Sequence, residues 1–251
     1  MKKLIVANWK MNPATPREAK ELYAKIRKMS LAQTAAEVVI CPPAVFLGFL
    51  NHKNSSRLSL GVQDIAVHKD AGAFTGSVSA SQVRYAGAEY VIVGHSERRA
   101  AGDSGDIINT KIKLALAAKL KVVLCVGETE RDEHGKYLDI LAKQVETALA
   151  GVPKGFYKKI IIAYEPVWAV GRVALGADTP AEFLHHKLFI QKIISKLIGG
   201  KAAKEVAVLY GGSVNAKNAA DFLRQGNADG LLVGRESLRA DHFKQIIYEA
   251  R

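Results

Sequence analysis

Cysteines are few, and no spacing in the sequence is typical of a metal site. The only two, Cys41 and Cys125, lie far apart and each ends an apolar run, so we expect neither a disulfide framework nor a zinc site. The seven histidines have no HExxH spacing, and the adjacent His185 and His186 cannot face the same side of a helix. We therefore predict two reduced, packed thiols and no bound metal.

Long apolar runs are also missing. No stretch approaches the roughly 18 uninterrupted apolar residues of a membrane helix. The opening Met1-Lys2-Lys3 is followed by only Leu4–Ala7 before Asn8, and this run is too short for a secretory signal. These absences predict a soluble, cytoplasmic protein that does not enter a membrane.

Acidic residues are fewer than basic ones, and the formal net charge is +12. A basic surface attracts anions, including nucleic acid. Here the lysines and arginines are spread along helical segments such as Lys20–Lys28 and Lys187–Lys196, with no arginine-rich tail and no aromatic-basic stacking motif. A solvated basic surface is the stronger interpretation, and we expect no specific nucleic-acid partner.

Short β-rich apolar runs recur along the 251 residues, and segments with helical signals separate them. Helix starts are predicted at Thr15-Pro16-Arg17-Glu18 and at Thr179-Pro180-Ala181-Glu182, and further helices over Asp106–Lys119 and Tyr137–Leu149. The predicted strands are Leu4–Ala7, Val38–Ile40, Leu58–Val62, Tyr90–Val93, Lys121–Val126, Lys159–Tyr164, Val206–Tyr210 and Gly230–Val233.

The order of strands and helices indicates a parallel sheet. Several strands are apolar on both faces, as burial between helices and a filled interior requires. An open doubly wound sheet would give the same order, but no GxGxxG fingerprint follows the first strand, and eight units suit closure. We predict an α/β fold, a (β/α)8 barrel of eight parallel strands with outer helices, in a single domain over residues 1–251.

Polar residues and glycines collect just after the carboxyl ends of the predicted strands. In a closed barrel these ends share one rim, which carries the chemistry of barrel enzymes. The residues are Asn8 and Lys10 after the first strand, His95, Ser96 and Glu97 after the fourth, Glu165 after the sixth, Gly211-Gly212-Ser213 after the seventh, and Gly234 and Arg235 after the eighth.

Three of these residues suit proton chemistry, although each has a simpler interpretation. Glu165, at the mouth of a dry pocket, would have the raised basicity of a general base, or would form a rim ion pair. His95 is an electrophile or a hydrogen-bonded core histidine. Lys10 extends to solvent or, beside Asn8, binds an anion or stabilises an enolate.

The glycine-containing turns after the last two strands are either tight turns or a phosphate site. Barrels often bind phosphate at this position through backbone N–H groups, and glycine lets the backbone approach the anion closely. The residues therefore indicate a phosphorylated small substrate, a carboxylate base and an imidazole partner. They do not select the substrate.

At these same residues the sequence closely resembles the triosephosphate isomerase family, essentially from end to end. The motifs that carry the resemblance are Ala7-Asn8-Trp9-Lys10-Met11-Asn12, Gly72-Ala73-Phe74-Thr75-Gly76, Val93-Gly94-His95-Ser96-Glu97-Arg98-Arg99, Cys125-Val126-Gly127-Glu128-Thr129, Ala163-Tyr164-Glu165-Pro166-Val167-Trp168-Ala169 and Tyr210-Gly211-Gly212-Ser213-Val214. The resemblance implies an aldose–ketose isomerase of glycolysis and gluconeogenesis, which interconverts dihydroxyacetone phosphate and D-glyceraldehyde 3-phosphate through an enediolate, without a cofactor.

The resemblance also assigns roles. Glu165 would move the proton between carbons, neutral His95 would donate to the substrate oxygens, and Lys10 and Asn8 would stabilise the developing negative charge. Glu97 would complete the polar network. Backbone groups at Gly171, Ser213, Gly234 and the following Arg235 would hold the phosphate. A water-excluding lid is expected, with Pro166-Val167-Trp168 as its first hinge.

Two departures from the family pattern affect the phosphate side of the site. After Trp168 the family has a short glycine-threonine-glycine-lysine tip, whereas the stretch Ala169–Asp178 is about two residues longer. In the eighth loop the family has two glycines, but here Arg235 follows Gly234. A backbone N–H survives that change, and the arginine side chain points away or reaches the anion itself.

A homodimer is also implied by the resemblance. The Ala73–Gly76 segment matches a projecting loop that inserts into the neighbouring subunit near Met11 and Asn12. A lone aromatic at a loop tip, Phe74, gains from burial in a partner.

Two rival functions remain to be tested. A different phosphosugar isomerase or lyase would suit the same scaffold, because a fold does not fix a reaction. A catalytically silent scaffold that binds polyanions through its basic surface is the other alternative. Lys10, His95 and Glu165 in matched motifs argue against both.

Overall fold

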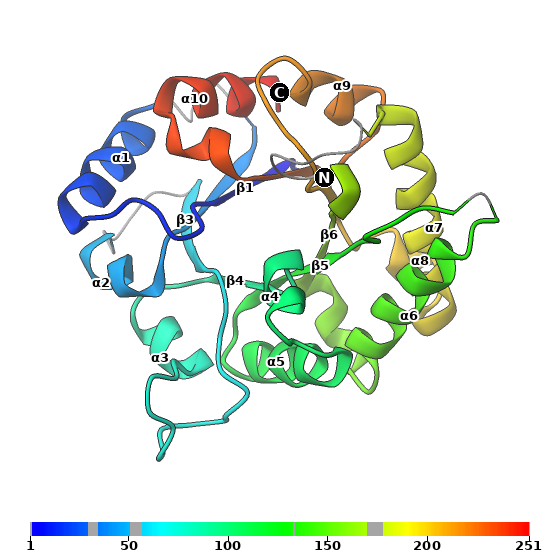
Figure 1. The fold of residues 1–251 in the computed structure, drawn as a ribbon, viewed down its shortest axis with the longest axis horizontal. Helices are drawn as coiled ribbons and strands as arrows, with labels where there is room; N and C mark the ends of the chain where they lie inside the picture. The colour runs from blue at the N-terminus through cyan, green and yellow to red at the C-terminus, as the bar shows by residue number, and fades with distance from the viewer. Residues whose placement is uncertain (1, 30–34, 51–56, 133, 170–177, 251) are drawn as a thin grey trace.

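Eight parallel strands close into a barrel in chain order, and helices surround them (Figure 1). The computed structural model describes residues 2–29, 35–50, 57–132, 134–169 and 178–250. The strands are β1 (Leu4–Asn8), β2 (Glu37–Cys41), β3 (Leu58–Val62), β4 (Tyr90–Val93), β5 (Lys121–Val126), β6 (Ile160–Tyr164), β7 (Val208–Tyr210) and β8 (Gly230–Val233). The predicted (β/α)8 barrel is confirmed.

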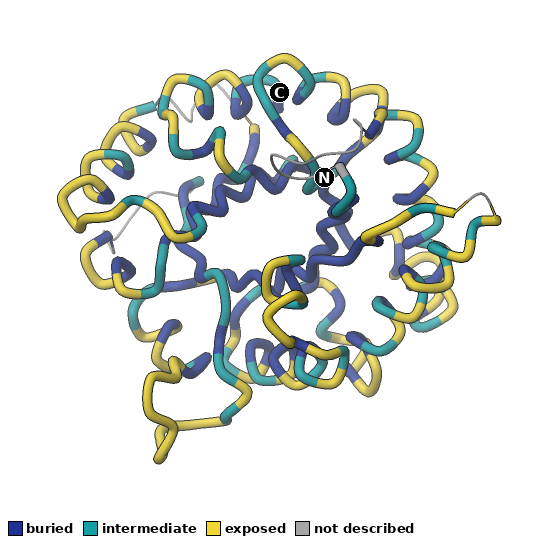
Figure 2. The backbone as a smooth tube through the Cα atoms, viewed as in Figure 1, coloured by how far each residue is buried: buried dark blue, intermediate teal, exposed yellow. Residues whose placement is uncertain are grey.

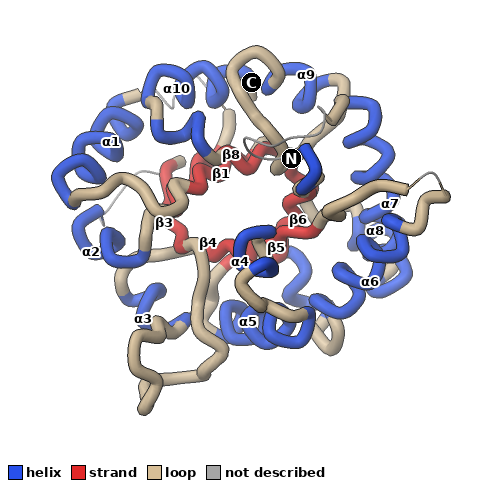
Figure 3. The backbone as a smooth tube through the Cα atoms, viewed as in Figure 1, coloured by secondary structure: helices blue, strands red, loops and turns tan. Residues whose placement is uncertain are grey.

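The helices form an outer ring around the strands (Figure 3). None of the helices in the described part of the chain is long and apolar enough to cross a membrane. The α-helices are α1 (Pro16–Lys28), α2 (Leu47–Leu50), α3 (Ala80–Tyr85), α4 (Ser96–Ala100), α5 (Gly105–Ala117), α6 (Tyr137–Leu149), α7 (Pro180–Ile198), α8 (Gly200–Ala203), α9 (Ala219–Arg224) and α10 (Ala240–Glu249). Short 3₁₀ turns are η2 (Ala44–Phe46), η3 (Lys154–Lys159), η4 (Val167–Ala169) and η5 (Arg235–Leu238).

The strand predictions differ from the structure mainly at the amino ends of β6 and β7. β6 begins at Ile160 because η3 occupies the preceding residues. β7 begins at Val208 because Val206 lies in the turn that follows α8, where its N–H donates to Ala203. These two predictions placed the strand starts too early, since a 3₁₀ turn and a strand end look alike in a short apolar run.

Both predicted helix starts with a Thr-Pro signal are confirmed. At α1 the Thr15 side chain accepts from the N–H of Glu18, and the Glu18 carboxylate accepts from the N–H of Thr15. Thr179 and Glu182 make the same reciprocal pair at α7. Each of these reciprocal pairs, known as capping boxes, gives a hydrogen-bond acceptor to backbone N–H groups that have no partner inside the helix.

Closure of the barrel depends on β1, which pairs in parallel with both β2 and β8. Ile5 lies opposite Val38 on one side and Leu231 on the other. Because every strand has two neighbours, the sheet has no free edge, and all the carboxyl ends meet at one rim.

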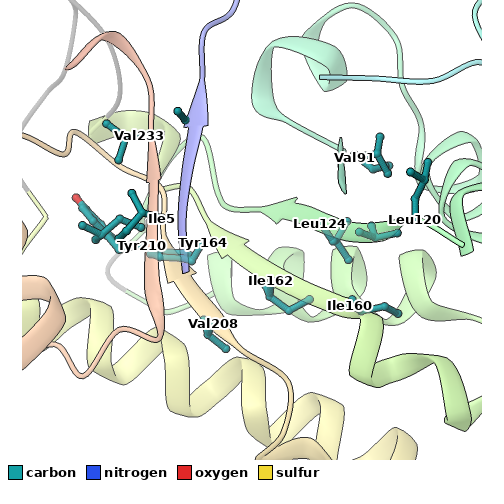
Figure 4. Packing of buried hydrophobic residues seen from close by; sticks show 14 of the residues in the cluster. Ile5, Val91, Leu120, Leu124, Ile160, Ile162, Tyr164, Val208, Tyr210 and Val233 are labelled. Carbon is teal, nitrogen blue, oxygen red and sulfur yellow. The ribbon is translucent and has the colours of Figure 1, made fainter. Parts of the chain in front are cut away.

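Alternate strand residues divide between two apolar clusters, and both faces of the sheet are buried (Figure 2). One cluster packs the strands against the helices and includes Val91, Leu124 and Ile162 (Figure 4). The other fills the barrel interior and includes Val6, Ile92 and Leu209. Burying one such side chain stabilises the fold by roughly 1.5–3 kcal/mol, so the rim rests on a rigid scaffold.

The two cysteines are free and fully buried, as the sequence predicts. Cys41 lies inside the barrel, where its Sγ is 2.6 Å from the position that a Cβ on Gly61 would take. Burial raises the pKa of both thiols, so neither is a reactive thiolate at neutral pH.

Candidate active site

A cavity of about 380 Å³ opens at the rim formed by the carboxyl ends of the strands. Its walls come from loops that follow β1, β4, β6, β7 and β8. The lining residues are Asn8, Trp9, Lys10, Asn12, His95, Glu165, 211–215, Leu232, Gly234, Arg235, Glu236 and Leu238. Most of the predicted site residues therefore meet in one cavity.

Two predicted site residues are not among the lining residues. Glu97 contacts the lining residue Lys10 through its carboxylate. Gly171 lies outside the described residues, as do residues 172–177 of the altered lid stretch.

Glu165 is held at the end of β6 by backbone contacts. Its N–H donates to the carbonyl of Val126 at 2.8 Å, and its Oε2 accepts from the N–H of Ser96 at 3.1 Å. A Cβ on Gly127 would lie 1.8 Å from the carbonyl oxygen of Glu165. Only glycine at that position lets the two loops approach this closely, and the carboxylate is 4% exposed.

His95 faces Glu165 across the cavity. It caps the N-terminus of α4, and its Nδ1 accepts from the N–H of Glu97 at 3.2 Å. A nitrogen that accepts a hydrogen bond carries no proton, so the assigned neutral tautomer has its proton on Nε2. Nε2 lies 3.3 Å from Oε1 of Glu165, which places a donor beside the carboxylate.

Lys10 adopts an unusual backbone conformation, with φ of 53°. Its N–H donates to Asn8 Oδ1 at 3.0 Å, and its carbonyl accepts from Gln63 Nε2 at 2.8 Å. A non-glycine residue in the left-handed region persists only where its surroundings hold it. These contacts fix the direction in which the ammonium group leaves the chain.

The Lys10 ammonium forms an ion pair with Glu97, at 2.6 Å between Nζ and Oε1. Partial burial acts to raise the pKa of Glu97, but the hydrogen bond and the charge of Lys10 outweigh it and lower that pKa. Glu97 is therefore ionised at neutral pH and holds the cation at the cavity.

The loop after β7 lies against Glu165. Gly211 donates its N–H to the carbonyl of Tyr164 at 2.8 Å. A Cβ on Gly211 would lie 3.0 Å from Glu165 Cγ, and one on Gly212 would lie 2.3 Å from the Tyr210 hydroxyl. Ser213, the next residue, lines the cavity, and its carbonyl accepts from Asn218 Nδ2 at 2.8 Å.

The loop after β8 brings a second cation to the cavity. Gly234 lies near Lys10, and its carbonyl accepts from the N–H of Ser237 at 2.9 Å at the start of η5. Among the described residues Arg235 has no ion-pair partner, whereas Glu236 pairs with His242 at 2.6 Å. The guanidinium of Arg235 is thus free to meet an anion.

Sequence reasoning missed two side chains that support the site. Gln63 links the carbonyls of Lys10 and Cys41, both at 2.8 Å. Arg99 donates to the carbonyls of Gly94 and Cys125, at 2.7 and 2.9 Å, and so ties β4 to β5. For Arg99 the signal was present, because it stands in the motif that begins at Val93.

The predicted first hinge, Pro166-Val167-Trp168, leads into η4. Trp168 Nε1 donates to Glu128 Oε1 at 2.9 Å, and the Tyr164 hydroxyl donates to the same carboxylate at 2.8 Å. Glu128 is fully buried, so the chain on the carboxyl side of Glu165 is anchored to the end of β5.

The loop between β3 and α3 projects away from the barrel (Figure 1). At its tip Phe74 is 44% exposed and stacks on His68, with 3.4 Å between ring centroids. Met11, in the loop after β1, is 92% exposed. A cavity of about 620 Å³ lies between these two loops and is lined by Met11, Gln63 and Val78, among others.

Comparison with known proteins gives consistent matches over the chain. The family model described as triosephosphate isomerase matches residues 3–250. A triosephosphate isomerase of Chlorobium phaeobacteroides is 41% identical, over 99% of each chain. Those of Natranaerobius thermophilus and Enterobacter cloacae are 38% and 39% identical, over 99% and 98% of this chain and 96% of each relative.

Proposed function

Because the chain belongs to the triosephosphate isomerase family, we propose that the rim cavity is its active site and that Glu165 is its catalytic base. Members of this family are aldose–ketose isomerases, and the chain interconverts dihydroxyacetone phosphate and D-glyceraldehyde 3-phosphate, a step of glycolysis and gluconeogenesis. The observation that carries the proposal is the 3.3 Å approach of Glu165 to the Nε2 of His95 inside this cavity.

Glu165 removes a proton from one substrate carbon and returns it to the next. Abstraction of a proton next to a carbonyl needs a carboxylate aimed at carbon and donors aimed at oxygen. The N–H of Ser96 and the imidazole of His95 hold the free carboxylate on one side of the cavity. Substrate that enters the cavity replaces these contacts and leaves the carboxylate facing its carbon atoms.

His95 acts as the donor to the substrate oxygens. The neutral imidazole with its proton on Nε2 polarises the carbonyl and then transfers protons between the two oxygens of the enediolate. Lys10 and Asn8 stabilise the negative charge that develops on these oxygens. Glu97 keeps the Lys10 ammonium at the cavity through their 2.6 Å ion pair.

The phosphate group binds at the loops after β7 and β8. Backbone groups of Ser213, Gly234 and Arg235 approach the anion at this end of the cavity, and the guanidinium of Arg235 adds a positive charge. Gly171 is proposed as a further backbone contact on the basis of the family motif, and it lies outside the described residues.

We also propose a homodimer joined through the Ala73–Gly76 loop. An exposed Phe74 at the loop tip and an exposed Met11 beside a cavity are apolar surfaces that a second copy would cover.

A single domain over residues 1–251 agrees with one closed barrel, and a cytoplasmic location agrees with a glycolytic enzyme.

A coupled assay with glyceraldehyde 3-phosphate tests the base, with Glu165→Asp as the variant. The shorter side chain withdraws the carboxylate by about one methylene, so kcat should fall by two orders of magnitude or more while the fold is kept, since small misplacements are this costly. Methylglyoxal, measured in the same reactions, reports how well water is excluded from the enediolate.

An equal rate in both proteins would refute the assignment of Glu165. No turnover by the wild-type protein would instead favour the silent polyanion-binding scaffold, whose signature would be salt-dependent binding of a polyanion.

A further inference from the structure

A cluster of ionisable side chains lies beside the proposed active site, around Arg131 in the loop after β5. Its guanidinium contacts Glu128 Oε1 and Glu182 Oε1, both at 3.0 Å, and the Tyr164 hydroxyl at 3.2 Å. It also lies 4.3 Å from the ring of Trp168. Arg131 thus joins the end of β5 to Tyr164 and Trp168, which lie on either side of Glu165 in the sequence, and to the first turn of α7.

Asp178 is the one member of this cluster without a hydrogen bond to its carboxylate within the described part of the chain. Its side chain is fully buried, and its Oδ1 lies 3.5 Å from the nearest Arg131 nitrogen, beyond the other three contacts. Glu128, Asp178 and Glu182 together supply more negative charge than one guanidinium balances. A buried carboxylate in this position is disfavoured unless it takes up a proton.

The groups that face Asp178 come from several elements. Arg131 approaches from the loop after β5, Glu182 from α7, and Tyr210 from β7. Burial, opposed by the charge of Arg131 and reinforced by that of Glu182, raises the pKa of Asp178 to about 7. The protonated and ionised forms are therefore both populated near neutral pH.

His186, also on α7, is the other group near this cluster that could titrate. Its ring stacks on Tyr164 with 4.7 Å between centroids, and its Nδ1 lies 2.7 Å from the carbonyl of Glu182. Burial lowers the pKa of His186, so it is neutral when Asp178 titrates. The pKa of Tyr164 is raised by burial and by Glu128, which keeps the phenol neutral.

We propose that Asp178 is a positioning residue that acts on the active site through Arg131. With Asp178 protonated, the guanidinium stays on Glu128, Tyr164 and the face of Trp168. Ionised Asp178 draws it toward its own carboxylate, 3.5 Å away, and weakens the anchor behind Glu165. Asp178 stands at the end of the stretch Ala169–Asp178, where the sequence departs from the family pattern. The inference rests on the proposed role of Glu165.

The first test follows Trp168 in the free protein and needs no turnover. The chain has only two tryptophans, so ¹⁹F NMR of fluorotryptophan-labelled protein gives two resonances, which a Trp9→Phe variant assigns. The Trp168 resonance should shift with pH, with a midpoint near 7. Asp178→Asn keeps the side chain neutral with almost the same shape, and should abolish this pH-dependent change in chemical shift.

Three further variants identify the titrating group. Glu182→Gln removes a carboxylate that raises the pKa of Asp178, so the midpoint should move to lower pH. His186→Gln should leave the midpoint in place, and Asp139→Asn, an exposed acid on α6, should match the wild type. The proposal would be overturned if the pH-dependent change in the Trp168 chemical shift survived in Asp178→Asn, or if it vanished in His186→Gln. If Asp178→Asn does not fold, an unmoved midpoint in Glu182→Gln overturns it.

The second test asks whether this titration reaches the reaction. Above the midpoint, the ratio of kcat in Asp178→Asn to kcat in the wild type should rise severalfold, while KM changes little. If this ratio of kcat values does not change with pH while the Trp168 resonance titrates as expected, Asp178 titrates without positioning the site, and the proposal is overturned. Failure of Glu165 as base would appear instead in the Glu165→Asp assay and would leave the NMR result unchanged.

Discussion

At Arg235 the chain places a guanidinium where its family pattern has glycine. The side chain lines the active-site cavity without an ion-pair partner among the described residues. A hydrogen bond to a charged group contributes about 1.5–3 kcal/mol, so Arg235→Ala should raise KM by roughly 10-fold to 100-fold while kcat changes little. Steady-state kinetics measure this effect. Arg239→Ala, an exposed arginine outside this cavity, is the matched control. An unchanged KM in Arg235→Ala would mean that the side chain points away from the phosphate.

Asp178 also makes a prediction about stability. Its folded-state pKa is raised from 3.8 to about 7, so between these values the folded protein binds more protons than the unfolded chain. The free energy of unfolding therefore falls as pH rises through this window, and stays lower above it. Asp178→Asn lacks this loss, so its stability relative to the wild type should increase by a few kcal/mol between about pH 4 and about pH 8. Urea denaturation at both pH values measures the difference, and a constant difference would contradict the assigned pKa.

Among the elements, α1 and α7 begin with the same capping box, and this makes them a natural pair for comparison. Thr15→Ala and Thr179→Ala each remove a side-chain acceptor from the first turn, and each should lower the free energy of unfolding by about 1 kcal/mol. Thermal melts at equal protein concentration should show a decrease in Tm of about 2–4 °C for each variant. Loss of stability in only one of them would mean that tertiary contacts, rather than the box, fix the start of the other helix.

The elements also show where sequence reasoning was accurate. Strands β3, β4, β5 and β8 have the predicted bounds, because each is a short, mostly apolar run. β6 and β7 were predicted too long at their amino ends, where η3 and the turn after α8 precede them. A 3₁₀ turn leaves no periodicity long enough to detect in the sequence.

At the scale of the whole molecule, the exposed apolar loop tip predicts the assembly. Phe74→Asp places a charge on the surface that a second copy would bury, so the protein should become a monomer at concentrations where the wild type is a dimer. Sedimentation velocity measures the change. Tyr85→Asp is the control, since Tyr85 is 90% exposed at the end of α3 and lies outside the loop. A wild-type protein that sediments as a monomer would refute the proposed dimer.

The sequence by itself determined the alternation of strands and helices, the helix starts and the rim on which Asn8, Lys10, His95 and Glu165 collect. These features depend on local patterns, and a parallel barrel brings all its strand ends to one edge whatever the side chains are. The family motifs added the reaction.

Only the tertiary structure decided which side chains support that rim. Gln63 reaches Lys10 across 53 residues of sequence, and Arg131 reaches Glu182 across 51. The sequence alone does not distinguish Asp178 from an ordinary surface acid. Its raised pKa depends on burial beside Arg131 and Glu182. Contacts between distant segments, and the loss of water around a charge, exist only once the chain has closed on itself, so no local pattern of residues encodes them.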